Sequence, residues 1–472
     1  MAYNDNVLSR DTLSSLCENL RKNNSIDAEF YARYGVKRGL RNSDGTGVMA
    51  GLTKVCSVEG YYIDDGERIP KDGKLIYRGV DVDEIVAGCR RENRFGFEEV
   101  AYLLLFGSLP TAKRLTGFID LLSRCRELPQ DFIEDVIMKA PSSNIMNKLA
   151  RSVLALYSFD PEPDDISTEN VVRQSIQLIA QLPSIMSYAY QVKRRHYDRK
   201  SMYIHPIVDG QKTAEVVLHS IRADRQFTDA EAKLLDLCLL LHADHGGGNN
   251  STFATRVLTS SGTDTYSAIA AGIGSLKGPK HGGANLKVAQ MVNYFKEGVQ
   301  NWEDEGQIAD FLTKIVRKEA GDGSGLIYGM GHAVYTLSDP RAVILKREAE
   351  AFAKDTEFEA DFRLLSAIEK LTPEIFAREK KNTKKVCANV DLYSGLIYKM
   401  LRIPEDLYTP LFTVARVAGW CAHRIEENMT GGRIMRPAYK SLSLPQDYIP
   451  LYERTEDTEA LGHRAYIPSE ER

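Results

Sequence analysis

Apolar residues recur every three or four positions along most of the chain, which is the pattern of helices that bury one face. The clearest stretches are residues 97–106, 231–242 and 411–425. A further helical stretch, 171–192, contains Pro183, and we expect a kink or a break there because proline cannot donate the helical hydrogen bond. Few strands and many helices predict an all-α fold.

Strand-like patterning is confined to one region near the N-terminus. Tyr61-Tyr62-Ile63 and residues 74–79 are rich in aromatic and β-branched side chains, and the turn-forming Asp64-Asp65-Gly66 lies between them. We therefore predict a minor β hairpin attached to a helical body.

The pattern changes between residues 288 and 385, where the apolar runs shorten and charged residues become more frequent. This change predicts a smaller helical domain inserted into a larger one. The expected organisation is an N-terminal arm at 1–47 with a polar helix at 11–22, a large helical domain at 48–284 and 396–472, and a small domain at 285–395.

Composition excludes several classes of function. Among 472 residues, 61 Lys and Arg face 65 Asp and Glu, for a net charge of −4, which argues against general nucleic-acid or membrane-surface binding. No apolar run is long enough for a membrane span, and no secretory signal is visible. The seven cysteines contain no C-x-x-C pair and are typical of reduced thiols. We expect a cytoplasmic protein.

Histidines flanked by glycine form the first candidate site. His242, His245 and His281 lie in or beside two glycine-rich loops, and His332 lies in a third at 329–332. Backbone N–H groups and helix ends in such loops hold imidazole neutral, able to donate a hydrogen bond to a developing oxyanion. For a single histidine, a structural role is as common.

A metal site is the alternative interpretation. His242 and His245 lie on one face of a helix end, with Asp244 between them, as in a metal-dependent hydrolase. However, the loops carry more glycine than carboxylate, and neither H-E-x-x-H nor a cysteine ligand pair occurs. We expect no metal and no other cofactor.

Arginines and one aspartate extend the candidate site. Arg341, Arg416 and Arg436 each lie among apolar or turn residues, where a guanidinium can bind a carboxylate or form a structural ion pair. Three of them together fit a dicarboxylate substrate. Asp391, between Val390 and Leu392, is either an N-cap or a general base in a partly apolar site.

Three motifs, in this order, resemble those of citrate synthase. They are Gly-Pro-x-His-Gly-Gly-Ala-Asn at 278–285, Gly-x-Gly-His-Ala-Val at 329–334 with Asp-Pro-Arg at 339–341, and Asn-Val-Asp at 389–391. The resemblance covers about residue 50 to about residue 437. It implies a helical homodimer whose two domains close over the substrates, and an acyltransferase that condenses acetyl-CoA with oxaloacetate and water to give citrate and CoA.

The resemblance also implies a role for each candidate residue. His281 is similar to the histidine that donates to the thioester oxygen, Asp391 to the base that removes a methyl proton, and His332 to the histidine that polarises the ketone. His245, Arg341 and Arg416 resemble the oxaloacetate ligands, and Arg436 the arginine that the other subunit contributes.

Some features leave alternatives open. Lys384, Gly329 and Gly331 match positions near coenzyme A, although a solvated loop explains Lys384 equally well. Ala388 replaces the proline that usually precedes Asn-Val-Asp. The alternative activities are 2-methylcitrate synthesis from propionyl-CoA, hydrolysis by a metal enzyme, and binding of a dicarboxylate or CoA without catalysis.

Overall fold

The computed structural model describes residues 14, 17, 26–380, 385–443, 445 and 448–454. Apart from residues 14 and 17, the helix predicted at 11–22 lies outside this part of the chain, and so does Lys384. The chain divides into two units, residues 1–49 with 436–472, and residues 50–435. The first contains the helix α2 (Ala28–Arg33) and the short 3-10 helices η1 (Arg38–Leu40) and η5 (Leu451–Glu453).

The second unit begins with a three-stranded antiparallel sheet in the order β1-β2-β3. Its strands are β1 (Cys56–Asp64), β2 (Glu67–Tyr77) and β3 (Val80–Asp81). Asp64 pairs with Glu67 across a two-residue turn in which Asp65 and Gly66 both have positive φ, the geometry that joins tightly paired strands. The predicted hairpin is confirmed.

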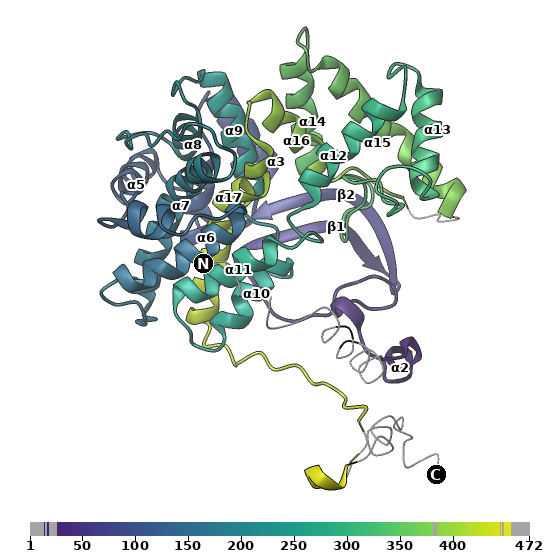
Figure 1. The fold of residues 1–472 in the computed structure, drawn as a ribbon, viewed down its shortest axis with the longest axis horizontal. Helices are drawn as coiled ribbons and strands as arrows, with labels where there is room; N and C mark the ends of the chain where they lie inside the picture. The colour runs from purple at the N-terminus through teal and green to yellow at the C-terminus, as the bar shows by residue number, and fades with distance from the viewer. Residues whose placement is uncertain are drawn as a thin grey trace. The chain divides into compact units, whose positions relative to one another are not determined.

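Helices form the rest of this unit, which confirms the all-α prediction (Figure 1). The first half contains α3 (Val82–Arg91), α4 (Phe97–Phe106), α5 (Ala112–Arg124), η2 (Ile133–Met138), α6 (Ile145–Leu156), η3 (Tyr157–Phe159), α7 (Thr168–His196), α8 (Thr213–Ile221) and α9 (Asp229–His242). The second half contains α10 (Asn250–Thr259), α11 (Thr265–Leu276), α12 (Ala284–Gly298), α13 (Glu305–Val316), α14 (Pro340–Ala353), α15 (Glu359–Lys380), α16 (Asp391–Met400), η4 (Glu405–Leu407) and α17 (Tyr408–Met429).

Helices α7 and α17 run through the middle of the main hydrophobic core. Both are buried along most of their length, and they pack against each other and against α4, α6, α8 and α9. A break at Pro183 is contradicted, because α7 continues from Thr168 to His196, whereas a kink there stays a prediction. Its neighbours around Pro183 are fully buried, and this packing outweighs the one hydrogen bond that proline cannot donate.

A second hydrophobic cluster lies within the range predicted for the small domain. Its buried members fall between Met291 and Ile375 and come from α12, α13 and α15, apart from Val299 and Ile327. Helices α12 to α16 lie to one side of the hairpin in Figure 1, and α5 to α9 to the other. The predicted boundaries at 285 and 395 stay a prediction. No helix in the described part of the chain is long and apolar enough to cross a membrane.

Candidate active site

The C-terminal end of α9 positions His245. Thr228 and Glu231 form a capping box at the start of this helix, and the chain leaves it after His242 into a buried turn. The Tyr77 hydroxyl from β2 donates to the carbonyl oxygens of Leu240 and Asp244, each at 3.2 Å. Strand β2 thereby holds the turn that carries His245.

Two other loops pair with each other as a short antiparallel ladder. The Gly331 N–H donates to the Cys387 carbonyl and the Asn389 N–H to the Gly329 carbonyl, both at 2.8 Å. Gly329 has φ +82°, and a Cβ there would lie 2.9 Å from the Leu392 Cα. This close approach requires glycine, and it places the loop of His332 against the start of α16.

The His332 ring lies beside the His245 ring, with centroids 5.1 Å apart and planes at 88°. Tyr335 stacks on His332 at 4.7 Å. The backbone N–H groups of Val334 and Tyr335 both donate to His332 Nδ1, each at 3.1 Å. Because Nδ1 accepts two hydrogen bonds, the proton of the neutral ring lies on Nε2.

Arg341 owes its position to the Asp-Pro-Arg sequence. Asp339 caps α14 by accepting from the Arg341 N–H at 3.0 Å, and Pro340 occupies the first helical position, where no N–H is needed. The Arg341 side chain returns onto the same carboxylate, with Nε to Oδ1 at 3.0 Å and Nη2 to Oδ2 at 2.7 Å. Its remaining N–H groups are the ones that a substrate carboxylate can use.

Arg416 is buried without a carboxylate partner among the described residues. Its Nε donates to the His242 carbonyl at 2.6 Å, and its Nη1 has no hydrogen-bond partner. Burial and the charge of Arg341 lower the pKa of Arg416 to about 10, although Asp244 acts in the opposite direction. A buried cation that has no carboxylate partner strongly favours the binding of an anion.

Asp391 is the first residue of α16. Burial raises the pKa of its carboxyl to about 6, even though the charges of Arg341 and Arg416 oppose the shift. The capping role considered for Asp391 is wrong, because the Asn389 Oδ1 accepts the Asp391 N–H at 3.0 Å instead. The Asp391 carboxylate is left available as a base.

His281 lies in the turn between α11 and α12. Its Nε2 is 3.0 Å from the Ser251 hydroxyl, which also accepts from Trp420 Nε1 at 3.2 Å. The Ser251 hydroxyl has one proton, which it can donate either to His281 Nε2 or to Asn249 Oδ1 at 2.9 Å. When it donates to Nε2, the His281 proton lies on Nδ1. Burial and the charge of Arg416 lower the pKa of His281 to about 4, so the ring is neutral near pH 7.

Comparisons with known proteins identify the family to which this site belongs. The family described as citrate synthase, C-terminal domain, matches residues 43–438. A citrate synthase from Synechocystis sp. is 32% identical over 86% of this chain and 92% of its own length. The chain belongs to the citrate synthase family. A 2-methylcitrate synthase from Shewanella oneidensis is also 32% identical, over 80% of this chain and 92% of its own.

A solved structure of a citrate synthase from Thermoplasma acidophilum, in ternary complex with carboxymethyl coenzyme A and oxaloacetate, is also similar. It is 25% identical, with a TM-score of 0.71, over 89% of this chain and 99% of that one. The likeness therefore extends over nearly the whole of that chain.

Three further residues lie beside this site, and of these only His242 was a candidate from the sequence. His242 stacks on Phe412 at 4.1 Å, and both of its ring nitrogens are buried without a hydrogen-bond partner among the described residues. Burial and the charges of Arg341 and Arg416 lower its pKa well below the ordinary value. The H-x-x-H spacing pointed to His242, whereas no sequence pattern pointed to Ser251 or Trp420, which come from α10 and α17.

The roles of the remaining predicted residues stay predictions. Arg436 belongs to the unit of residues 1–49 and 436–472, so its role stays a prediction. Gly329 and Gly331 lie in the His332 loop, but their backbone groups are used by residues 387–389, and their role toward coenzyme A also stays a prediction. Lys384 lies outside the described residues.

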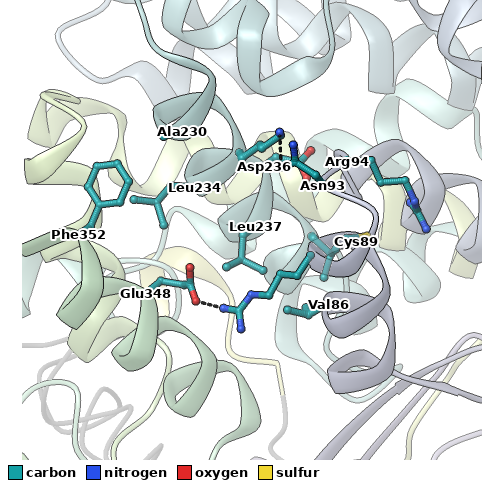
Figure 2. A pocket seen from close by; sticks show the side chains of 13 residues that line it. Val86, Cys89, Asn93, Arg94, Ala230, Leu234, Asp236, Leu237, Glu348 and Phe352 are labelled. Atoms are coloured by element: carbon teal, nitrogen blue, oxygen red, sulfur yellow. Dashed lines mark hydrogen bonds and ion pairs between the residues drawn. The ribbon is translucent and has the colours of Figure 1, made fainter.

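A cavity of about 270 Å³ lies between α3, α9 and α14 (Figure 2). Arg90 and Glu348 form an ion pair in its wall, and Lys233 donates to Asn93 at 2.7 Å. Its polar groups thus pair with one another. Within the described residues, no three His, Cys, Asp or Glu side chains gather as metal ligands. Metal independence stays a prediction.

Proposed function

We propose that this protein is a citrate synthase that condenses acetyl-CoA with oxaloacetate and water to give citrate and free CoA. The observation that carries the proposal is that the charges of two buried arginines, Arg341 and Arg416, act both on the Asp391 carboxyl, whose pKa is about 6, and on the ring of His245. The charge of Arg416 also acts on His281, whose ring is neutral. A base for a weak carbon acid, donors for two oxyanions and cations for a dicarboxylate are the parts that this condensation needs.

Oxaloacetate binds through the arginines and His245. The unpartnered Arg416 Nη1 and the outer N–H groups of Arg341 bind its two carboxylates. His245 Nε2 is also buried without a partner, and the ring is neutral because burial and the charge of Arg341 lower its pKa. Hydrogen bonds from the substrate to these unpartnered groups offset the free-energy cost of burying them away from water.

Acetyl-CoA is activated by Asp391 and His281. The Asp391 carboxylate removes a proton from the thioester methyl group while the His281 Nδ1–H stabilises the enolate oxygen. The neutral state of His281 suits this role, since a neutral donor of matched strength stabilises the enolate without protonating it fully. This role requires the Ser251 hydroxyl, which accepts from Trp420, to donate to His281 Nε2, so that the ring proton lies on Nδ1.

The carbon–carbon bond then forms at the ketone of oxaloacetate. The enolate carbon attacks the carbonyl carbon, and the carbonyl oxygen takes the proton from His332 Nε2, the nitrogen that carries it when Nδ1 accepts from Val334 and Tyr335. Water then cleaves the thioester of the condensation product, which releases the CoA thiol and citrate.

Propionyl-CoA is the second candidate substrate, because the 2-methylcitrate synthase relative is as similar as the citrate synthase one. Thiol release from each acyl-CoA, with and without oxaloacetate, tests both. Release that requires oxaloacetate and is faster with acetyl-CoA supports the proposal. Faster release with propionyl-CoA would make the protein a 2-methylcitrate synthase, and release without oxaloacetate would indicate a hydrolase.

We also propose a cytoplasmic homodimer in which Arg436 completes the partner's site. Glu426 and Glu427, the local carboxylates that Arg436 would otherwise pair with, are both bound by Arg256, at 3.2 and 2.7 Å. This supports a partner-directed role for Arg436. The cysteines are free thiols, as in a reducing compartment.

A further inference from the structure

A buried network of polar side chains connects the turn of His245 with the C-terminal end of α17. The Asp244 Oδ2 lies 3.2 Å from His423 Nε2, and His423 Nδ1 lies 3.3 Å from Arg256 Nη1. Arg256 in turn forms ion pairs with Glu426 and Glu427. The side chains of Asp244 and His423 are completely buried. None of the predicted catalytic residues belongs to this network.

The order of the hydrogen bonds fixes the tautomer of His423. A guanidinium can only donate, so His423 Nδ1 must accept from Arg256, and the ring proton must lie on Nε2. Nε2–H then donates to the Asp244 carboxylate. The two glutamates balance the charge of Arg256 in its buried position, and the network as a whole therefore directs one N–H at Asp244.

Asp244 transmits this constraint to the substrate side. Its Oδ2 also accepts from the Gly246 N–H at 2.9 Å. This oxygen therefore links His423 to the residues directly before and after His245. Burial raises the pKa of Asp244, but contact with His423, the charge of Arg416 and the Gly246 N–H together lower it to about 2. The carboxylate thus stays ionised and keeps accepting both hydrogen bonds.

We propose that His423 is a positioning residue that acts through Asp244 to hold His245 in the orientation that binds oxaloacetate. The inference rests on the proposed function, since it assigns oxaloacetate to His245. It predicts that the Nε2–H donor of His423, and not merely the volume of the ring, sets the affinity for oxaloacetate.

Two amide substitutions test the two ring nitrogens of His423 one at a time. In His423→Gln the amide nitrogen reaches the position of Nε2 and can still donate to Asp244, whereas in His423→Asn the shorter side chain reaches only the Arg256 side. His423→Leu removes both hydrogen bonds. His219→Leu is the matched control, because His219 is a buried histidine on α8 whose Nε2 has no partner.

Initial rates with each substrate varied in turn, thermal unfolding, and oxaloacetate titration by calorimetry give the readouts. We expect His423→Asn and His423→Leu to raise KM and Kd for oxaloacetate about tenfold to a hundredfold, the worth of a buried hydrogen bond to a charged group. KM for acetyl-CoA at saturating oxaloacetate should change little, and His423→Gln should restore most of the affinity. His219→Leu should leave both KM values unchanged.

Either of two results would overturn the proposal. One is an oxaloacetate affinity within twofold of wild type in His423→Asn. The other is a His423→Gln variant as impaired as His423→Asn, with both KM values rising in step with lost thermal stability, which would make His423 a packing residue. If His423→Leu does not fold, the Gln and Asn pair decides alone. Failure of the proposed function is separate, because the wild-type protein would then show no oxaloacetate-dependent thiol release.

Discussion

The side-chain nitrogen of Asn389 donates a hydrogen bond to the carbonyl oxygen of Gly331 at 2.9 Å. The oxygen of the same amide accepts from the Asp391 N–H at 3.0 Å. One amide therefore sets the separation between the loop that carries His332 and the helix start that carries Asp391. The proposed base and ketone donor are positioned together, although 58 residues separate Gly331 from Asn389.

Replacing this amide tests its role. Asn389→Ala should lower kcat about a hundredfold, because a displacement of about 1 Å between reacting groups has an effect of this size. Loss of the hydrogen bond that Asn389 accepts from the Asp391 N–H should also lower the free energy of unfolding by about 1 kcal/mol. Asn389→Asp keeps the acceptor for Asp391 but loses the donor to Gly331, so a similar fall in kcat without the loss of stability is expected.

Steady-state rates and thermal unfolding measure both effects. Asn147→Ala on the exposed face of α6 is the control and should change neither. Wild-type turnover in Asn389→Ala would show that the ladder between the two loops holds them without the amide.

The pH dependence of the rate should report Asp391. Its folded-state pKa is raised to about 6, and only the ionised form acts as a base. Activity at low substrate concentrations should therefore fall tenfold for each pH unit below about 6 and level off above it. Asp391→Asn should lose turnover by orders of magnitude while still binding oxaloacetate. A rate that is constant from pH 5 to 7 would exclude Asp391 as the base.

Gly419 lets α17 approach the turn of His245. A Cβ at this position would lie 2.3 Å from the Asp244 Oδ1 and 2.5 Å from the Ala243 carbonyl oxygen. Gly419→Ala should therefore displace the turn, weaken oxaloacetate binding and reduce stability by about 1–3 kcal/mol.

Gly274→Ala on α11 provides the matched control. A Cβ there has no atom within 4 Å, so this helical alanine should increase stability by about 0.5–1 kcal/mol and leave the kinetics unchanged. Chemical denaturation and oxaloacetate titration compare the two variants. Equal stability and equal oxaloacetate affinity in the two variants would mean that the turn of His245 can shift without loss of either.

Exhaustive chelation should leave activity intact, because the histidines are proposed to hydrogen-bond substrate instead of holding a metal ion. Elemental analysis should then find no stoichiometric metal in the active protein. Activity that chelation removes and that zinc or manganese restores would favour the metal-dependent hydrolase instead.

Sharing of the site across a dimer predicts complementation. An inactive Arg436→Ala chain is mixed with an inactive Asp391→Asn chain under conditions that allow subunits to exchange. If Arg436 serves the partner's site, each heterodimer has one intact site and one with both lesions, and about a quarter of wild-type activity per chain returns. If Arg436 acts in its own chain, every site carries one lesion, and the mixture stays inactive.

The sequence by itself determined the local structure and the order of the chemical groups. Periodicity identified α4, α9 and α17, since the apolar face of a helix is written into neighbouring positions. The turn at residues 64–66 was equally local, because its geometry depends on two adjacent residues. The three motifs also identified the family, because each keeps its residue types at fixed spacing.

Only the tertiary structure decided which groups meet and in what state. The contact between Ser251 and His281, the burial that raises the pKa of Asp391, and the partner of Asp244 depend on helices far apart in the chain. The continuity of α7 through Pro183 was decided in the same way, by packing on all sides. Burial and hydrogen-bond direction are properties of the surroundings, and no local pattern of residues contains them.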